Sequence, residues 1–210
     1  GVSISETYSK TNETDPIVFA RQIEGEGMDA DGTIVAGREL AALNRAVRNL
    51  MSAGVPVVCL TTDLPSSRRD VYVGNNQHAA GSVAAMLIGR VLPAEPANNP
   101  SMMSVAFRCQ QEREMGFRRV LRSDFPHIKA DERMISDDRP KYTRDQLVKH
   151  FRTHGLPSAV YSAAGANRAV AVALEEFDPE RETIFVGHEL TNHSPRLLEL
   201  GTMERPKGKV

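Results

Sequence analysis

Short apolar runs alternate along the chain with segments whose apolar residues lie three or four positions apart. The first pattern is typical of buried strands and the second of amphipathic helices. In the first half of the chain we predict helices at Pro16–Ile23 after the capping residue Asp15, at Leu40–Ala53 before Gly54, and at Ala79–Leu92. The predicted strands are Val2–Ile4, Gly32–Ala36, Val55–Leu60 and Val71–Val73.

The same alternation restarts after Pro93–Pro100, whose three prolines and two asparagines are typical of a linker. Alternation of strands with helices predicts parallel βαβ units. The fold class is therefore α/β, with a lobe over 1–95, a second lobe over 101–202, a tail over 203–210, and a cleft between sheet ends. The second lobe is expected to hold strands at Met102–Ala106, within Ile128–Ile135, at Ala159–Tyr161 and at Thr183–Gly187, and helices at Glu112–Ser123, Thr143–His154, Asn167–Glu176 and Ser194–Leu200.

The composition is that of an ordinary soluble globular protein, with 40% hydrophobic and 25% charged residues. A net charge of −1 gives the chain no electrostatic footprint for nucleic acid. No run approaches the roughly 20 apolar residues of a membrane span, so we expect no membrane partner. The first residues lack the layout of a signal peptide, which favours the cytoplasm, although a mature exported protein would lack one too.

Residues that often carry chemistry are few. Cys59 and Cys109 lie in strand-like surroundings and are expected to be reduced core thiols. His150 and His154 have a spacing that suits a metal, but no third ligand is evident, and a solvated helix face explains them better.

Enzyme motifs are also lacking, because the chain has no Gly-x-Ser-x-Gly, P-loop or Gly-x-Gly-x-x-Gly sequence. His188 beside Glu189 has the composition of an acid/base pair in a cleft, but the position fits a binding residue better. We therefore expect a binding protein with no cofactor.

Four blocks carry a resemblance to the sugar-binding core of LacI/GalR-type transcriptional regulators and to their relatives, the periplasmic sugar-binding proteins. Asn75-Asn76 and Ala80-Gly81 are similar to the family's Asp-Asn and Ala-Gly pairs, and Arg113 to Phe117 to its Arg-x-x-Gly-Phe. The blocks are Gly54–Gly81, Glu112–Arg118, Tyr161–Leu174 and Phe185–Thr191.

The resemblance implies two Rossmann-like lobes of the periplasmic-binding-protein type I fold, incomplete at both ends. The family's first strand–helix unit has no counterpart here, nor does the final crossover with its glutamine. It also implies that a small sugar or polyol binds in the cleft between the lobes.

Two functions fit this resemblance. In the first, the chain is the effector-binding core of a cytoplasmic, homodimeric transcriptional regulator. Its effector allosterically controls DNA binding by a helix-turn-helix domain outside these residues. The unpaired cysteines and the His-Glu-Leu-Thr sequence favour it. In the second, the chain is a periplasmic sugar-binding protein of an ABC transporter. A remnant that binds no ligand is a third possibility.

Hydroxyl groups of a sugar call for carboxylates, amides, hydroxyls and an arginine fork. The resemblance places such groups where strands end. The candidate ligand-binding residues are Thr61, Thr62, Asp63, Arg113, Ser162, Asn167 and Glu189.

Each charged or amide candidate also has a structural explanation. Arg113 is equally explained as a surface arginine paired with a neighbouring glutamate. Glu189 is equally a helix cap or a solvent-facing carboxylate, and Asp63 a turn former at a strand end. Asn167 is equally the cap of its helix.

Overall fold

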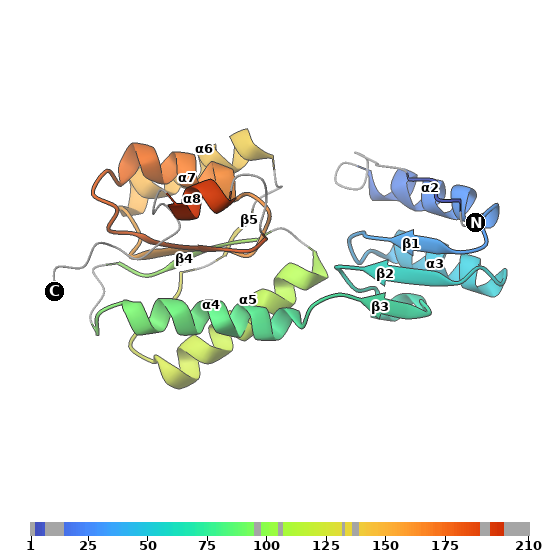
Figure 1. The fold of residues 1–210 in the computed structure, drawn as a ribbon, viewed down its shortest axis with the longest axis horizontal. Coiled ribbons are helices and arrows are strands. Elements are labelled where there is room, and N and C mark those ends of the chain that lie inside the picture. Colours follow the sequence, from blue (N-terminus) through green and yellow to red (C-terminus); the bar gives the residue numbers. More distant parts are fainter. Residues whose placement is uncertain are drawn as a thin grey trace. The chain divides into compact units, whose positions relative to one another are not determined.

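Parallel strands form two separate sheets, one in each of two units of the chain (Figure 1). The computed structural model describes residues 3–6, 15–94, 98–104, 107–131, 133–135, 139–189 and 194–199. Unit 1 comprises Gly1–Asn75 with Phe107–Cys109, and unit 2 comprises Asn76–Ala106 with Gln110–Val210.

This division differs from the boundary that the proline-rich stretch 93–100 indicates. The reason is the helix after Asn76, whose buried residues pack into the core of unit 2. Residues 95–97 of the expected linker and the expected tail, 203–210, lie outside the described residues.

Unit 1 is a three-stranded parallel sheet in the order β1-β2-β3. Apolar side chains of α2 and α3 and of one sheet face form its core, which includes Phe19, Leu50, Val57 and Cys59. The opposite sheet face keeps aliphatic side chains exposed, for example Ile34 at 69%. The elements are α2 (Pro16–Met28), β1 (Thr33–Val35), α3 (Ala41–Ser52), β2 (Val57–Leu60), the 3-10 turn η1 (Pro65–Ser67) and β3 (Val71–Val73).

The start of α2 follows the prediction, because the Asp15 carboxylate accepts hydrogen bonds from the first turn of the helix. Its predicted end at Ile23 is wrong, since α2 continues through two glycines to Met28. Packing overrides the low helix propensity of glycine here: a Cβ at Gly27 would lie 2.9 Å from the Leu50 side chain. Residues 3–6 form no strand, so the strand predicted at Val2–Ile4 is not found there, and Val2 lies outside the described residues.

Unit 2 is a four-stranded parallel sheet in the order β5-β4-β6-β7. All of the strands and helices predicted for the second lobe form, with shifted ends; α5 begins at Arg108 and not at Glu112. The elements are α4 (Gln77–Val91), β4 (Ser101–Ser104), α5 (Arg108–Asp124), β5 (Arg133–Ile135), α6 (Pro140–His154), β6 (Ala159–Ser162), α7 (Asn167–Phe177), β7 (Ile184–Gly187) and α8 (Ser194–Glu199).

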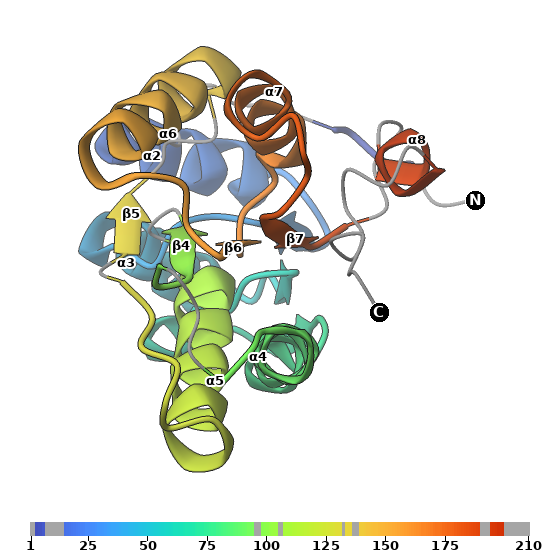
Figure 2. The same ribbon diagram turned by 90° about the vertical axis from the view of Figure 1, so that its left-hand side faces the viewer.

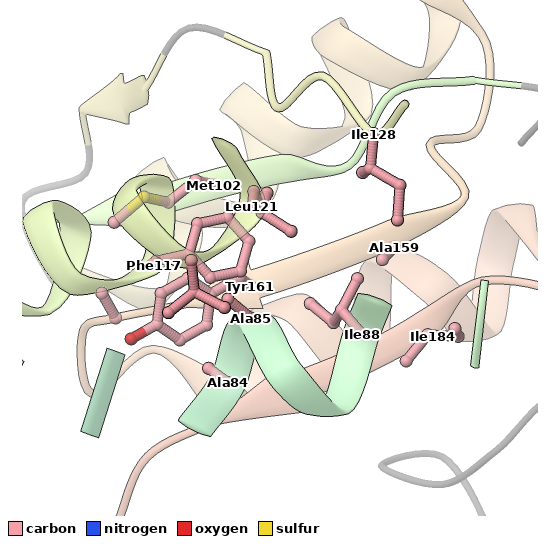
Figure 3. Packing of buried hydrophobic residues seen from close by; sticks show 12 residues of the cluster. Ala84, Ala85, Ile88, Met102, Phe117, Leu121, Ile128, Ala159, Tyr161 and Ile184 are labelled. Carbon is pink, nitrogen blue, oxygen red and sulfur yellow. The ribbon is translucent and has the colours of Figure 1, made fainter. Parts of the chain in front are cut away.

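Helices cover both faces of this sheet (Figure 2). On one face, α4 and α5 close a core in which the rings of Phe117 and Tyr161 stack with centroids 4.5 Å apart (Figure 3). On the other face, α6, α7 and α8 form a second core around Leu147, Val170 and Phe185. Burial of both faces is what a parallel sheet requires.

The two helices of the first face touch through their backbones. A Cβ at Gly81 of α4 would lie 1.8 Å from the Arg113 carbonyl oxygen, and a Cβ at Gly116 of α5 would lie 2.0 Å from the His78 carbonyl oxygen. Only glycine permits this approach. Gly81 and Gly116 belong to the Ala-Gly and Gly-Phe motifs of the sequence, which therefore have a packing role.

Gly81→Ala should lower the free energy of unfolding by about 2 kcal/mol or more, because the new methyl group forces backbone apart from backbone. Urea denaturation followed by circular dichroism measures it. Gly25→Ala in α2 is the control, since no heavy atom lies within 4 Å of its new Cβ. It should raise stability by roughly 0.5–1 kcal/mol through helix propensity. Equal effects of the two substitutions would contradict the close contact.

Candidate functional site

The polar groups of unit 2 gather at the carboxyl end of β6 and β7, which we call the β6–β7 edge. It consists of Ser162, the last residue of β6, with Ala163 and Ala164 after it, and of His188–Glu189 after β7. The two strands are in register there, with Ser162 opposite Gly187. Carboxyl ends of parallel strands are where α/β proteins bind ligands.

Arg113 reaches this edge from α5 and is only 5% exposed. Its Nε donates to Gln77 Oε1 over 2.8 Å, and its Nη1 donates to the Ala163 carbonyl over 2.8 Å. The explanation as a surface arginine paired with a neighbouring glutamate is therefore wrong, because α4 packs over the helix at this point. Its third nitrogen, Nη2, forms no hydrogen bond with a described residue.

Asn167 is the first residue of α7 and is 1% exposed. Its Nδ2 donates to the His188 carbonyl over 2.5 Å. This bond fixes the orientation of the amide, and the buried Oδ1 then has no hydrogen-bond partner among the described residues. Asn167 is not the helix cap, since the N-cap residue is Ala166 and no side-chain capping bond forms. An unpaired buried acceptor costs roughly 1–3 kcal/mol, so a donor from a ligand would relieve it.

His188 lies beside Tyr161, and its Nε2 is 2.7 Å from the tyrosine hydroxyl. Burial, and then the charge of Arg113, lower the pKa of His188 to about 4. Burial also raises the pKa of Tyr161. Both rings are therefore neutral at neutral pH, and the bond between them fixes the end of β7 against β6.

The other two candidates of unit 2 differ in exposure. Ser162 is fully buried, and its Oγ donates to the Ala164 carbonyl over 3.2 Å, so it shapes the turn after β6. Glu189 is exposed and has a left-handed backbone with φ 69°. Its carboxylate lies over Gly165, where an added Cβ would be 3.7 Å from Oε2. Its backbone carbonyl accepts a hydrogen bond from the Ser194 hydroxyl at the start of α8.

The candidates of unit 1 follow β2. Thr61 is left-handed, with φ 65°, which is a strained backbone for a β-branched residue and is typical of functional edges. Thr62 is buried, and its Oγ1 accepts the Cys109 amide over 3.4 Å. Asp63 accepts two bonds from Arg69, over 2.6 and 2.8 Å. The pKa of Asp63 is lowered, chiefly by this bond, so its carboxylate already has a partner.

Three residues near the β6–β7 edge, Gln77, Tyr161 and His188, are not among the predicted ligand-binding residues. A signal was present for two of them, since Tyr161 is the last residue of one predicted strand and His188 directly follows another. Tyr161 pairs with Val186, so His188, two positions further on, lies on the same sheet face as Tyr161. Gln77 carried no signal, because its role depends on the packing of α4 against α5.

The remaining chemistry is structural. Cys59 and Cys109 are both buried, as predicted, and form no disulfide among the described residues, although Cys109 lies in α5 and not in strand-like surroundings. Burial raises the pKa of Cys59. His150 Nε2 lies 3.0 Å from the Ser101 hydroxyl, and no group of three metal-ligating side chains forms among the described residues. In the same part of the chain, no helix is both long enough and apolar enough to cross a membrane.

Comparison with known proteins agrees with this architecture. The sequence profile of the periplasmic binding protein domain family matches residues 4–205, and the chain belongs to this family. No curated protein matches the chain. The predicted fold class, an α/β fold of the periplasmic-binding-protein type I with parallel sheets flanked by helices, is therefore confirmed.

Solved structures share the fold at low sequence identity. The glucose-galactose binding protein GanP from Geobacillus stearothermophilus is 23% identical, with a TM-score of 0.78 over 89% of this chain. An ABC transporter solute binding protein from Burkholderia graminis, in complex with D-arabinose, is 19% identical, with a TM-score of 0.79 over 90%. Another from Agrobacterium vitis, with bound D-fucose, is 14% identical, with a TM-score of 0.83 over 97%. The chain spans 66% of the first two structures and 70% of the third.

The neutral state of His188 makes stability depend on pH. The unfolded histidine titrates near its ordinary value of 6.5, while the folded one titrates at about 4. The unfolded chain therefore takes up this proton first as the pH falls. The stabilisation is complete above pH 6.5 and is lost as the pH falls towards 4. When the pH falls from 7.5 to 4.5, the free energy of unfolding of the unchanged protein should decrease by roughly 2 kcal/mol more than that of the His188→Gln variant.

Urea denaturation at the two pH values measures this difference. His127→Gln, a change at an exposed histidine, is the control and should keep the loss of the unchanged protein. If His188→Gln lost as much stability between the two pH values as the unchanged protein, a neutral, half-buried His188 would be contradicted.

Proposed function

We propose that this chain binds a sugar at the β6–β7 edge and serves as a solute-binding protein of a sugar transporter. The observation that carries the proposal is the pair of unused hydrogen-bonding groups in a buried setting. Asn167 Oδ1 lacks a donor, and Arg113 Nη2 lacks an acceptor, among the described residues. A hydroxyl group both donates and accepts, so a polyhydroxylated ligand suits the two groups.

Three further features support a sugar. Arg113 is held by two neutral acceptors, so its fork is preorganised before any ligand arrives. Glu189 adds an exposed carboxylate at the same edge. Related structures of the fold are described as sugar-binding or hold D-arabinose or D-fucose. Thr61 and Thr62 of unit 1 remain candidates, whereas the pairing of Asp63 with Arg69 favours its role as a turn former.

The related structures favour a transport protein over the regulator hypothesis. The solved structures above are a glucose-galactose binding protein and two ABC transporter solute binding proteins. The predicted homodimer, DNA partner and cytoplasmic location are all parts of the regulator hypothesis, so the related structures do not support them. Sedimentation velocity separates the two: a monomer with and without sugar supports transport, and a stable dimer supports regulation.

Binding should appear as a thermal shift with one or more members of a sugar panel that includes D-glucose, D-galactose, D-arabinose and D-fucose. At about 100 times its dissociation constant, a ligand adds about 2.7 kcal/mol of stability. Arg113→Gln and Asn167→Ala should each weaken binding by at least about tenfold, because each removes one buried hydrogen bond to the ligand. Isothermal titration calorimetry gives the affinities.

Matched controls separate binding from folding. Arg118→Gln changes a half-buried arginine of the same helix that pairs with Glu114. Asn44→Ala changes the other described buried asparagine whose Oδ1 has no partner. Both should leave the affinity unchanged. A cooperative thermal transition that no sugar shifts, or equal losses in the controls, would contradict the proposal.

A further inference from the structure

Among the residues that the structure describes, Arg113 is a buried cation without a counter-ion. Its two hydrogen-bond acceptors, Gln77 Oε1 and the Ala163 carbonyl oxygen, are both neutral. Within the described residues it forms no salt bridge, and its neighbour Glu114 is paired with Arg118 over 2.8 Å. Buried charges in proteins are normally paired, because an isolated one is costly to remove from water.

The groups that surround Arg113 do not supply the missing charge. Tyr161 and His188 face it from β6 and from the end of β7, and both are neutral at neutral pH. Glu189, on the same segment as His188, carries an exposed carboxylate over Gly165 and not an ion pair with Arg113.

We infer that the ligand itself carries the counter-charge: the β6–β7 edge takes a sugar derivative with one acidic group, placed on Arg113 Nη2. This inference rests on the proposed function and narrows its ligand class from sugars to sugar acids or sugar phosphates. The acidic oxygen accepts from Nη2, and a hydroxyl of the same molecule donates to Asn167 Oδ1. An anion alone would leave Asn167 Oδ1 without a donor, so both groups are needed on one ligand.

The test compares matched pairs by isothermal titration calorimetry at pH 7.5. The pairs are D-glucose with D-glucuronate, D-galactose with D-galacturonate, and D-arabinose with D-arabinonate. D-Glucose 6-phosphate and D-galactose 6-phosphate are titrated as well, to show whether the site prefers a phosphate or a carboxylate as the acidic group. In at least one pair, the acidic member should bind at least tenfold more tightly than its neutral partner. Arg113→Gln should remove that preference, and Arg118→Gln should keep it.

The outcomes distinguish the inference from the proposed function. A neutral sugar that binds as tightly as its acidic partners would overturn the inference and leave the proposed function standing. Acidic compounds that bind equally well to Arg113→Gln would also overturn it. A chain that folds cooperatively but binds neither kind of compound would contradict both.

Discussion

The backbone contact between α4 and α5 is the constraint on which the rest of unit 2 depends. Gly81 and Gly116 let the helices approach until carbonyl oxygens occupy the space of their missing Cβ atoms. This approach buries Arg113 beneath α4, where the side chain of Gln77 receives its Nε–H. It also places Phe117, one residue after the second glycine, against the ring of Tyr161. A larger residue at either glycine would separate the helices and displace the arginine from the β6–β7 edge.

From this contact, one line of hydrogen bonds runs along the edge of the sheet. Arg113 donates to the Ala163 carbonyl after β6, and the Tyr161 hydroxyl is hydrogen-bonded to His188 after β7. The His188 carbonyl in turn accepts a hydrogen bond from Asn167 of α7. The line ends at Asn167 Oδ1, an acceptor that has no donor in the part of the chain that the structure describes. A rigid framework that leaves one acceptor and one cationic nitrogen unused is preorganised for a ligand, because little ordering remains to be done when the ligand arrives.

Local sequence patterns predicted the α/β class and the order of nearly all elements, because each strand and helix of unit 2 has its own apolar pattern. A resemblance to a known family, and not geometry, placed Arg113 and Asn167 among the candidate binding residues. The patterns did not predict the burial of Arg113 or the pairing of Tyr161 with His188. Both depend on contacts between residues that are far apart in the sequence. Gly81 and Arg113 are separated by 32 positions, and Tyr161 and His188 by 27. The continuation of α2 through Gly27 has the same kind of cause, since it depends on packing against Leu50.

Side-chain nuclear magnetic resonance tests the central claim most directly, namely that Arg113 and Asn167 together contact the ligand. The Arg113 Nε–H and Asn167 amide signals are observed while the tightest-binding compound of the panel is added to saturation. The account predicts that both signals shift in proportion to the bound fraction, whereas those of Arg118 and Asn44 stay in place. Saturating binding that leaves the Arg113 and Asn167 signals unmoved would show that the ligand site lies elsewhere.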